Sequence, residues 1–311
     1  MLVDFFLFVI AFGLIWAGAG MIVKSVHDFA RANKYSEFAT SFFLLGILTS
    51  VPEIGVGFNS IAEQKPEIFV GNLLGGIITL FLLVIPILAI GGNGIRLSHD
   101  FSKRNLVLSL IVLTIPAFFM LDSNINLIEA ILMIIAYVAL VIQMFDQGLR
   151  VKNRFPNPLG VFQQKDKHAL LKIIIGITIV FIASRIVVDK TILISNAFNI
   201  PAFFISFFVI SLGTNIPELS LALRAVITGK KDIAFGNYLG SASVNVLLFG
   251  VFTLFNGGSV NSIDTFIFTF VVIINAFAWF YYFLRSSNDI SRREGLLLFS
   301  IYLLFAAVEI F

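Results

Sequence analysis

The chain has 311 residues, of which 59% are hydrophobic and only 13% are charged, and its formal net charge is +3. A soluble domain carries about a quarter charged residues, so this chain has too few polar side chains to cover a globule in water. The small net charge argues against nucleic-acid binding, and the absence of Cys excludes disulfides, thiolate metal sites and cysteine catalysis.

Ten segments are long and apolar enough to cross a membrane, since a helix needs roughly 20 apolar residues to span the hydrocarbon core. They are residues 2–23, 37–62, 67–91, 103–121, 126–145, 169–188, 201–227, 232–255, 262–284 and 294–311. We therefore expect an all-α integral membrane protein with ten transmembrane helices. The first segment has no basic residue before it and no small-residue cleavage site after it, so it is expected to be retained as a span.

The polar interval 146–168 contains two Pro residues and several Lys and Arg residues, and is expected to link two halves, 1–145 and 169–311. Ten spans place 18 of the 21 Lys and Arg residues on one side of the membrane. The other side receives only Lys65, Arg185 and Lys190. Because basic loops stay in the cytoplasm, this split predicts a multi-pass protein of the cell membrane with a cytoplasmic linker and both termini outside.

Two stretches of the chain repeat one another without a gap. Residues 46–82 read GILTSVPEIGVGFNSIAEQKPEIFVGNLLGGIITLFL, and residues 211–247 read SLGTNIPELSLALRAVITGKKDIAFGNYLGSASVNVL. At a fixed offset of 165, ten positions are identical, and Thr, Pro, Glu, Gly and Asn are among them. The copies begin in the second and seventh spans, so an odd number of crossings separates them. This predicts two inverted five-helix repeats, the plan of secondary transporters whose substrate site lies near the membrane midplane.

Each copy places a Pro-Glu pair inside an apolar span. Pro52 and Pro217 have no N–H to donate within the helix, so each frees a backbone carbonyl that only protein or a cation can satisfy in the membrane. Glu53 and Glu218 follow directly, and neither motif contains a Lys or Arg in its helix core to pair with them. An intramembrane carboxylate is expensive unless it is compensated, so a bound metal ion or a proton is the expected counter-charge.

Side-chain oxygens of Thr49, Ser50, Thr214 and Asn215 lie three or four residues before these carboxylates and are expected to share a helix face with them. In the eighth span, Ser241 and Asn245 lie four residues apart and are expected to share a face with each other. An all-oxygen set selects hard cations such as calcium, and sodium uses the same ligand type. We expect no cofactor, since the ions are the cargo.

Several polar residues also allow a purely structural interpretation. Ser and Thr within a span often bond their own helix, and this applies to Ser50, Ser241 and Asn245 as readily as ion binding does. For Asn72 and Asn237, bonding of freed backbone and ion contact are equally compatible with the sequence.

The repeats also contain glycines at small-xxx-small spacing, a pattern that lets helices approach closely. They are Gly71, Gly75 and Gly76 in the first copy, and Gly236 and Gly240 in the second. We interpret them as packing positions that bring the third and eighth spans against the broken helices.

The strings TSVPE and TNIPE, followed by GNLLG and GNYLG, resemble the α-repeats of the sodium/calcium exchanger family. The resemblance covers both repeats and agrees with the ten-span plan along nearly the whole chain. It implies antiport of calcium, or a similar hard cation, against sodium by alternating access. It also implies that Glu53 and Glu218 hold calcium between them, helped by Thr49 and Thr214.

For the flanking sodium sites, the resemblance implies ligands from the side chains of Ser241 and Asn245 and the carbonyls of Gly46 and Ser211. The first repeat departs from the family pattern, because Gly76 and Leu80 stand where an oxygen-bearing Ser and an acidic or amide residue are usual. Asn215 also replaces the usual Ser.

Alternatives to a sodium-coupled antiporter remain open at this point. Gly76 and Leu80 also fit a proton-coupled exchanger, or one with an altered ion stoichiometry, on the same fold. A cation channel or sensor is a poorer fit, because channels tend to form rings by oligomeric symmetry, whereas this chain carries its own pseudo-two-fold and one copy is expected to suffice. An enzyme is not expected, since HExxH and GxSxG strings are absent.

Overall fold

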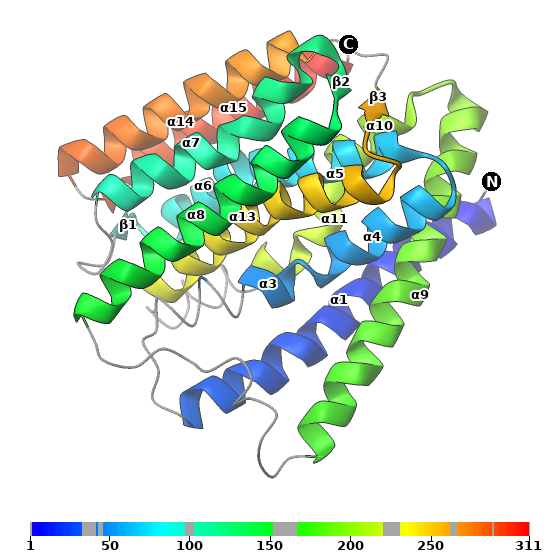
Figure 1. Ribbon diagram of the computed structural model, residues 1–311, viewed down its shortest axis with the longest axis horizontal. Coiled ribbons are helices and arrows are strands. Elements are labelled where there is room, and N and C mark those ends of the chain that lie inside the picture. Colours follow the sequence, from blue (N-terminus) through cyan, green and yellow to red (C-terminus); the bar gives the residue numbers. More distant parts are fainter. Residues whose placement is uncertain are drawn as a thin grey trace.

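The computed structural model describes residues 2–32, 42, 46–96, 103–151, 167–219, 231–261, 266–287 and 289–310. Within these residues the chain is nearly all helical (Figure 1). Seven helices are long and apolar enough to cross a membrane. They correspond to the first, third, fourth, fifth, sixth, eighth and ninth spans expected from the sequence. Parts of the second and seventh spans, and most of the linker 146–168, lie outside the described residues.

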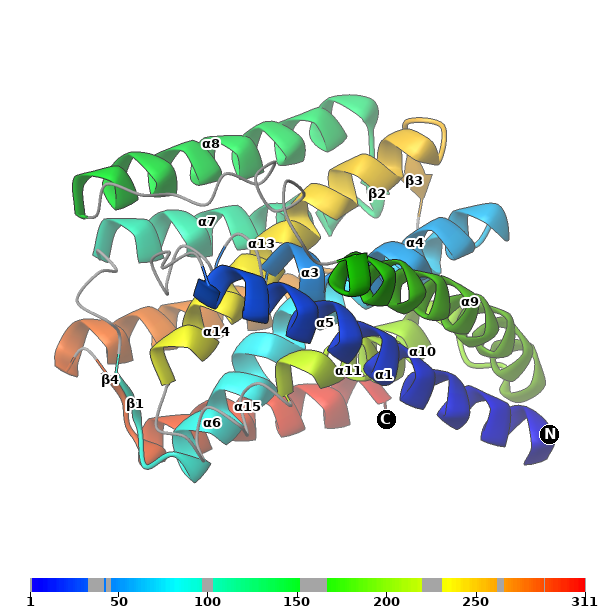
Figure 2. The same ribbon diagram turned by 90° about the horizontal axis from the view of Figure 1, so that it is seen from below.

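The long helices pack with neighbours that are distant in the sequence, since α1 lies beside α9, α13 beside α8, and α14 beside α7 (Figures 1 and 2). Their bounds are α1 Leu2–Ala32, α7 Lys103–Phe119, α8 Leu127–Val151, α9 Lys167–Phe198, α13 Lys231–Phe255, α14 Ile267–Ser287 and α15 Arg292–Ile310. The third span is a continuous helical rod of three parts, α5 Pro66–Thr79, the π-helical turn η2 Leu80–Val84, and α6 Ile85–Gly91. A short 3-10 turn, η3 Met120–Asp122, ends α7.

Two spans are broken at their Pro residues. The second span consists of α3 Gly46–Thr49 and α4 Val51–Ala62, with Ser50 at the break. The seventh consists of α10 Ala202–Ile205, the π-helical turn η5 Ser206–Ile210 and α11 Ser211–Thr214, and helix resumes at residues 216–219 after Asn215. The breaks follow from the sequence, because Pro lacks the N–H and its ring displaces the preceding turn.

Helix ends are tied together by two antiparallel strand pairs of two residues each. The strand β1 Ile95–Arg96 pairs with β4 Asp289–Ile290. The strand β2 Asn124–Ile125 pairs with β3 Val260–Asn261. These pairs join connections from the two halves of the chain at the ends of the bundle, which satisfies backbone groups where the helices stop.

The α5–α6 rod and α13 form the centre of the bundle. In the most apolar windows of these two spans 83% and 78% of residues are buried, against 28–50% in the other five candidate spans. Phe69 of α5 contacts Phe249 and Phe252 of α13, with ring centroids 5.9 Å and 5.5 Å apart. A charge placed on these two helices would therefore face protein and not lipid.

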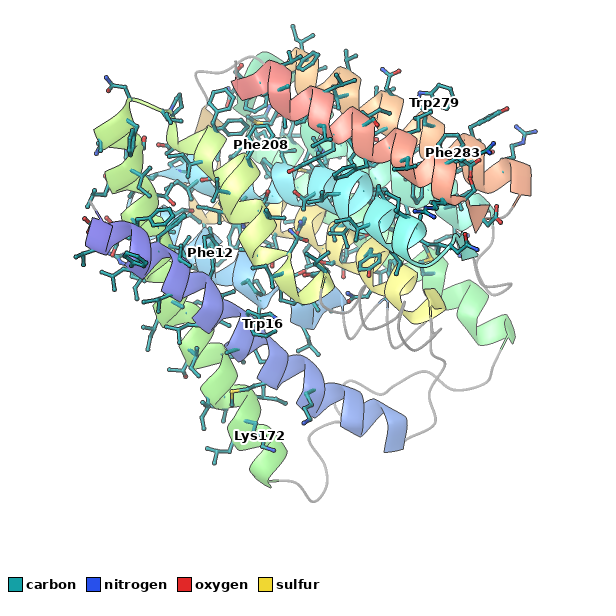
Figure 3. All side chains as sticks on the ribbon, turned by 180° about the vertical axis from the view of Figure 1, so that it is seen from behind. Phe12, Trp16, Lys172, Phe208, Trp279 and Phe283 are labelled. Atoms are coloured by element: carbon teal, nitrogen blue, oxygen red, sulfur yellow. The ribbon has the colours of Figure 1, made fainter. Side chains whose placement is uncertain are left out.

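The outer helices carry apolar side chains on the molecular surface, as a membrane requires (Figure 3). Trp16 of α1 and Trp279 of α14 are 51% and 42% exposed. The helices α1 and α9 pack against each other on one side of the bundle (Figures 1 and 3). They approach closely at Gly18 and Gly176, where a Cβ on Gly18 would lie 2.9 Å from the Gly176 carbonyl oxygen.

The helix α9 continues to Phe198, ten residues beyond the end expected for the sixth span. The charged residues near this end of α9 are paired. Lys190 Nζ lies 2.8 Å from Asp4 Oδ1, and Arg185 contacts both Glu63 and Asp189, the latter at 3.3 Å. Because these pairs hold the charges on one edge of the bundle, the helix extends through them. Arg185 and Asp189 thus form an i,i+4 ion pair within α9.

Candidate functional site

The two helix breaks adopt the same backbone conformation and place two carboxyl groups at the centre of the bundle. Ser50 has φ −81° and ψ 4°, and Asn215 has φ −88° and ψ 9°. In each case helix resumes within one or two residues, so that Glu53 and Glu218 lie in the first helical turn after the break. Both side chains are completely buried. A helix N-terminus presents free N–H groups and a partial positive charge to such a residue.

Each of the two carboxyl groups faces the repeat that contains the other one. The Thr214 hydroxyl interacts with the Glu53 carboxyl, and the Thr49 hydroxyl interacts with the Glu218 carboxyl. The two carboxyl groups also act on each other electrostatically. The two Pro-Glu motifs, 165 residues apart in the chain, therefore form one cluster of two acids and two threonines.

Most of the carboxylate oxygens in this cluster have no hydrogen-bond donor of ordinary geometry. Glu218 Oε1 accepts a 3.0 Å hydrogen bond from Ser241 Oγ. Glu218 Oε2 and both oxygens of Glu53 accept none, although Thr214 approaches Glu53. In the described part of the chain, the ion pairs of Lys and Arg go to acids other than these two. Three buried carboxylate oxygens thus lie in the cluster without a hydrogen bond of ordinary geometry.

Each threonine also contacts an asparagine of the other repeat. Thr214 Oγ1 donates to Asn72 Oδ1 at 3.1 Å, and Thr49 Oγ1 donates to Asn237 Oδ1 at 3.4 Å. The Nδ2 groups of both asparagines have no acceptor. The sequence left two roles open for Asn72 and Asn237. In the structure both accept hydrogen bonds from a threonine, so they orient the hydroxyls beside the carboxyl groups.

One flank of the central cluster is lined by hydroxyls. Ser50 Oγ lies 2.8 Å from the Gly46 carbonyl oxygen, to which it donates, and 3.3 Å from Ser241 Oγ. Ser241 in turn donates to Glu218. Gly46, Ser50, Ser241 and Glu218 therefore form a chain of oxygen atoms next to the centre. Ser50 does bond its own helix, as the structural interpretation expected, while keeping its oxygen in this chain.

The opposite flank is built from amides. Asn215 Nδ2 donates a 2.7 Å hydrogen bond to the Ser211 carbonyl oxygen. A Cβ added to Gly76 would lie 3.3 Å from Asn215 Nδ2 and 2.8 Å from Asn245 Nδ2. Neither polar atom of the Asn245 side chain has a hydrogen-bond partner, and both are buried. Leu80 is also completely buried, at the start of η2, and supplies no oxygen.

The close approach of helices around the cluster depends on glycine. A Cβ on Gly75 would lie 2.0 Å from the Phe207 carbonyl oxygen, and a Cβ on Gly240 would lie 2.1 Å from that of Phe42. Gly71 faces the Phe203 carbonyl oxygen in the same way, at 2.5 Å. The expected packing role of these glycines is confirmed: they seat α5 against α10 and η5, and α13 against the second span. Gly76 differs, because it faces the two asparagine side chains.

All ten residues expected to hold ions, from Gly46 to Asn245, are buried around this cluster. The chain matches the model of the sodium/calcium exchanger protein family over residues 3–145 and 168–311. This chain belongs to the sodium/calcium exchanger family. It is thus a membrane protein of a family of antiporters.

Several named relatives resemble the chain over most of its length. It is 26% identical to the putative antiporter CaxA of Alkalimonas amylolytica, over 80% of this chain and 79% of that protein. It is 28% identical to the inner membrane protein YrbG of Escherichia coli strain K12, over 70% and 69%, respectively. It is 23% identical to the sodium/calcium exchanger MaX1 of Methanosarcina acetivorans, over 98% of each chain.

The fold is also that of a solved exchanger. The structure is similar to that of the sodium-calcium exchanger NCX_Mj soaked with sodium and strontium ions, with a TM-score of 0.71. The similarity covers 98% of both chains at 23% sequence identity. This likeness supports the helical exchanger fold of the family member described here.

Proposed function

We propose that this protein is a secondary-active antiporter that exchanges calcium, or a similar hard cation, for sodium. The ions bind between Glu53 and Glu218, with Thr49 and Thr214 as further ligands. The observation that carries the proposal is the set of three buried carboxylate oxygens that accept no hydrogen bond of ordinary geometry. A carboxylate at membrane depth costs about 2.5 kcal/mol or more unless it is compensated, and a cation supplies that compensation.

The ligand chemistry favours a hard cation. The cluster offers carboxylates, hydroxyls and backbone carbonyls, which are the ligands that calcium takes in flexible six- to eightfold coordination. No cluster of three or more His, Asp and Glu side chains that could together hold a metal ion occurs in the part of the chain that the structure describes. A site with two acids and otherwise neutral oxygens suits an ion that must also leave, since tight binding would stop transport.

Antiport follows if the same two carboxyl groups hold either ion. Calcium and sodium then exclude each other, and each drives the release of the other. We assign residues 1–145 and 169–311 to two inverted five-helix halves that rock against each other to give alternating access. Contacts that recur at the 165-residue offset support this plan, since Gly75 meets Phe207 as Gly240 meets Phe42.

The basic residues set the expected orientation, with 18 of 21 on the side of the linker 146–168. We assign that side to the cytoplasm and both termini to the outside. A single chain contains both carboxyl groups, so one copy is sufficient for transport.

Purified protein in sodium-loaded liposomes tests the function. Uptake of radioactive calcium on dilution into sodium-free buffer is expected for the wild type, and is expected to be lost in Glu53→Gln and Glu218→Gln. Glu67→Gln is the matched control, because that carboxylate is partly exposed and pairs with Lys65. Normal uptake by both site variants would contradict the proposal.

A second candidate function is tested with a second set of liposomes in the same assay. The flank at Gly76 and Asn215 lacks a serine hydroxyl, which favours an exchanger in which protons, or fewer sodium ions, replace the usual counter-ions. Liposomes that carry a pH gradient and no sodium would take up calcium if protons were the coupling ion. Uptake that requires internal sodium and ignores pH would exclude proton coupling.

A further inference from the structure

The two flanks of the central cluster differ in a way that bears on the number of ions per cycle. At the 165-residue offset, Ser50 corresponds to Asn215, and Ser241 corresponds to Gly76. On the first flank the two residues are both serines, with oxygens 3.3 Å apart. On the second flank the equivalent of Ser50 is Asn215, which carries an amide, and the equivalent of Ser241 is Gly76, which has no side chain. These two residues also lie next to each other.

The amides of Asn245 and Asn215 border the space that Gly76 leaves free. A serine at position 76 would place its Cβ 2.8 Å from Asn245 Nδ2 and 3.3 Å from Asn215 Nδ2, so the amides take up room that a serine would otherwise share with an ion. Asn215 Nδ2 donates to the Ser211 carbonyl oxygen. On the hydroxyl flank the corresponding carbonyl, that of Gly46, accepts from Ser50, whose hydroxyl can rotate and leave the carbonyl to an ion. The Asn215 side chain is larger than a hydroxyl and holds the Ser211 carbonyl through its Nδ2, while its Oδ1 is buried without a hydrogen bond.

The charges of the site bear on the same question. Two carboxylates contribute two negative charges, and the Asn245 side chain beside Gly76 is a neutral amide. One divalent cation or two monovalent cations neutralise this site. A third monovalent cation would add a net positive charge, so it needs further oxygen ligands to offset the cost of burying it in the membrane.

We infer that the Asn215 amide takes the place of one cation, so that two sodium ions exchange for one divalent cation and the cycle moves no net charge. This inference rests on the proposed exchange function. The ions are held by the centre and by the flank that contains Ser50 and Ser241. The amide flank contributes a hydrogen-bond donor to the Ser211 carbonyl where an exchanger with a full set of sodium sites would bind a further ion.

The calcium gradient at which net flux stops measures the stoichiometry. Proteoliposomes are given fixed sodium gradients, their membrane potential is set with potassium and valinomycin, and the calcium ratio of zero net uptake is determined. We expect the ratio to be independent of the potential and to rise with the square of the sodium ratio. A cycle that moves one net charge would instead shift the ratio by about 50-fold per 100 mV, and would overturn the inference.

The outcomes separate this inference from the function on which it rests. Sodium-driven calcium flux with a voltage-dependent null point would agree with the proposed antiporter function and would contradict only the exchange of two sodium ions for one divalent cation. An absence of sodium-driven flux at every potential would overturn both. The wild-type measurement decides the stoichiometry by itself, whether or not any variant folds.

A double variant tests the role of Asn215. Asn215→Ser with Gly76→Ser gives the second flank the residues of the first, and we expect its null point to become voltage dependent, by up to about 50-fold per 100 mV. Gly76→Ser alone keeps the amide, and its null point is expected to stay independent of voltage. A double variant that transports calcium with an unchanged, voltage-independent null point would overturn the assignment of the amide.

Discussion

Thr214 donates a 3.1 Å hydrogen bond to Asn72, a residue of the other repeat, and so has its hydroxyl fixed beside the carboxyl group of Glu53. Thr49 and Asn237 make the corresponding contact at 3.4 Å beside Glu218. The threonines therefore connect the two repeats through asparagines as well as through the carboxyl groups. In this arrangement an ion ligand of one repeat is positioned by the other.

Replacing the Thr214 hydroxyl should weaken calcium binding without preventing membrane insertion. Thr214→Val removes both the ligand oxygen and the donor to Asn72, and leaves a buried amide oxygen without its partner. An unsatisfied buried polar group costs about 1–3 kcal/mol, so we expect the apparent calcium affinity in the uptake assay to fall about fivefold to a hundredfold. Thr214→Ser keeps the hydroxyl and is the control. Equal affinities for the Val and Ser variants would contradict a role for this oxygen.

Ser241→Ala should affect sodium more than calcium. Ser241 donates to Glu218 and lies 3.3 Å from Ser50, on the flank that we assign to a sodium ion. Hydrogen bonds to charged groups contribute about 1.5–3 kcal/mol, so the sodium concentration for half-maximal calcium exchange is expected to rise more than about tenfold. The half-saturating calcium concentration is expected to change less.

Ser243→Ala is the matched control for that prediction. Ser243 lies on the same helix and is also buried, but its hydroxyl donates to the Leu239 carbonyl of its own helix at 2.6 Å. Its loss should leave the dependence on sodium unchanged. A similar rise in both variants would show that the effect comes from the stability of α13 and not from ion binding.

Gly75→Ala should destabilise the bundle, because the added Cβ would lie 2.0 Å from the Phe207 carbonyl oxygen. The obstructing atom is backbone, so relief requires α5 to move away from η5. Overpacking of this kind costs about 1–3 kcal/mol, and the unfolding temperature in detergent is expected to fall. Gly13→Ala, where a Cβ meets nothing within 4 Å, is expected to leave it unchanged or raise it. An unchanged unfolding temperature in Gly75→Ala would contradict the packing role.

The chemistry of the site could be predicted from the sequence, because it is local. Pro52 and Glu53 are adjacent, and so are Pro217 and Glu218, so a helix break and a buried acid could be placed together without knowledge of the fold. The repeat supplied the evidence that both belong to one site. The bundle of apolar helices follows from composition and span length in the same way.

The contacts between repeats could not be predicted. A sequence repeat shows which residues occupy equivalent positions in the two copies, but it does not show which residues are in contact in the folded protein. Asn215 and Gly76 depart from the pattern in different copies, and their proximity depends on how α11 crosses α5. The Thr–Asn pairs likewise depend on how the helices of the two repeats cross. The extension of α9 was missed for a related reason, since the sequence does not show that Lys190 pairs with Asp4 of α1, 2.8 Å away.

Equilibrium binding of radioactive calcium to the purified protein tests the central claim most directly, namely that one pair of carboxyl groups holds either ion. We predict one calcium ion per chain, competitive displacement by sodium, and loss of binding in Glu53→Gln but not in Glu67→Gln. Calcium that stays bound in Glu53→Gln, or that sodium does not displace, would show that the ions do not share this site.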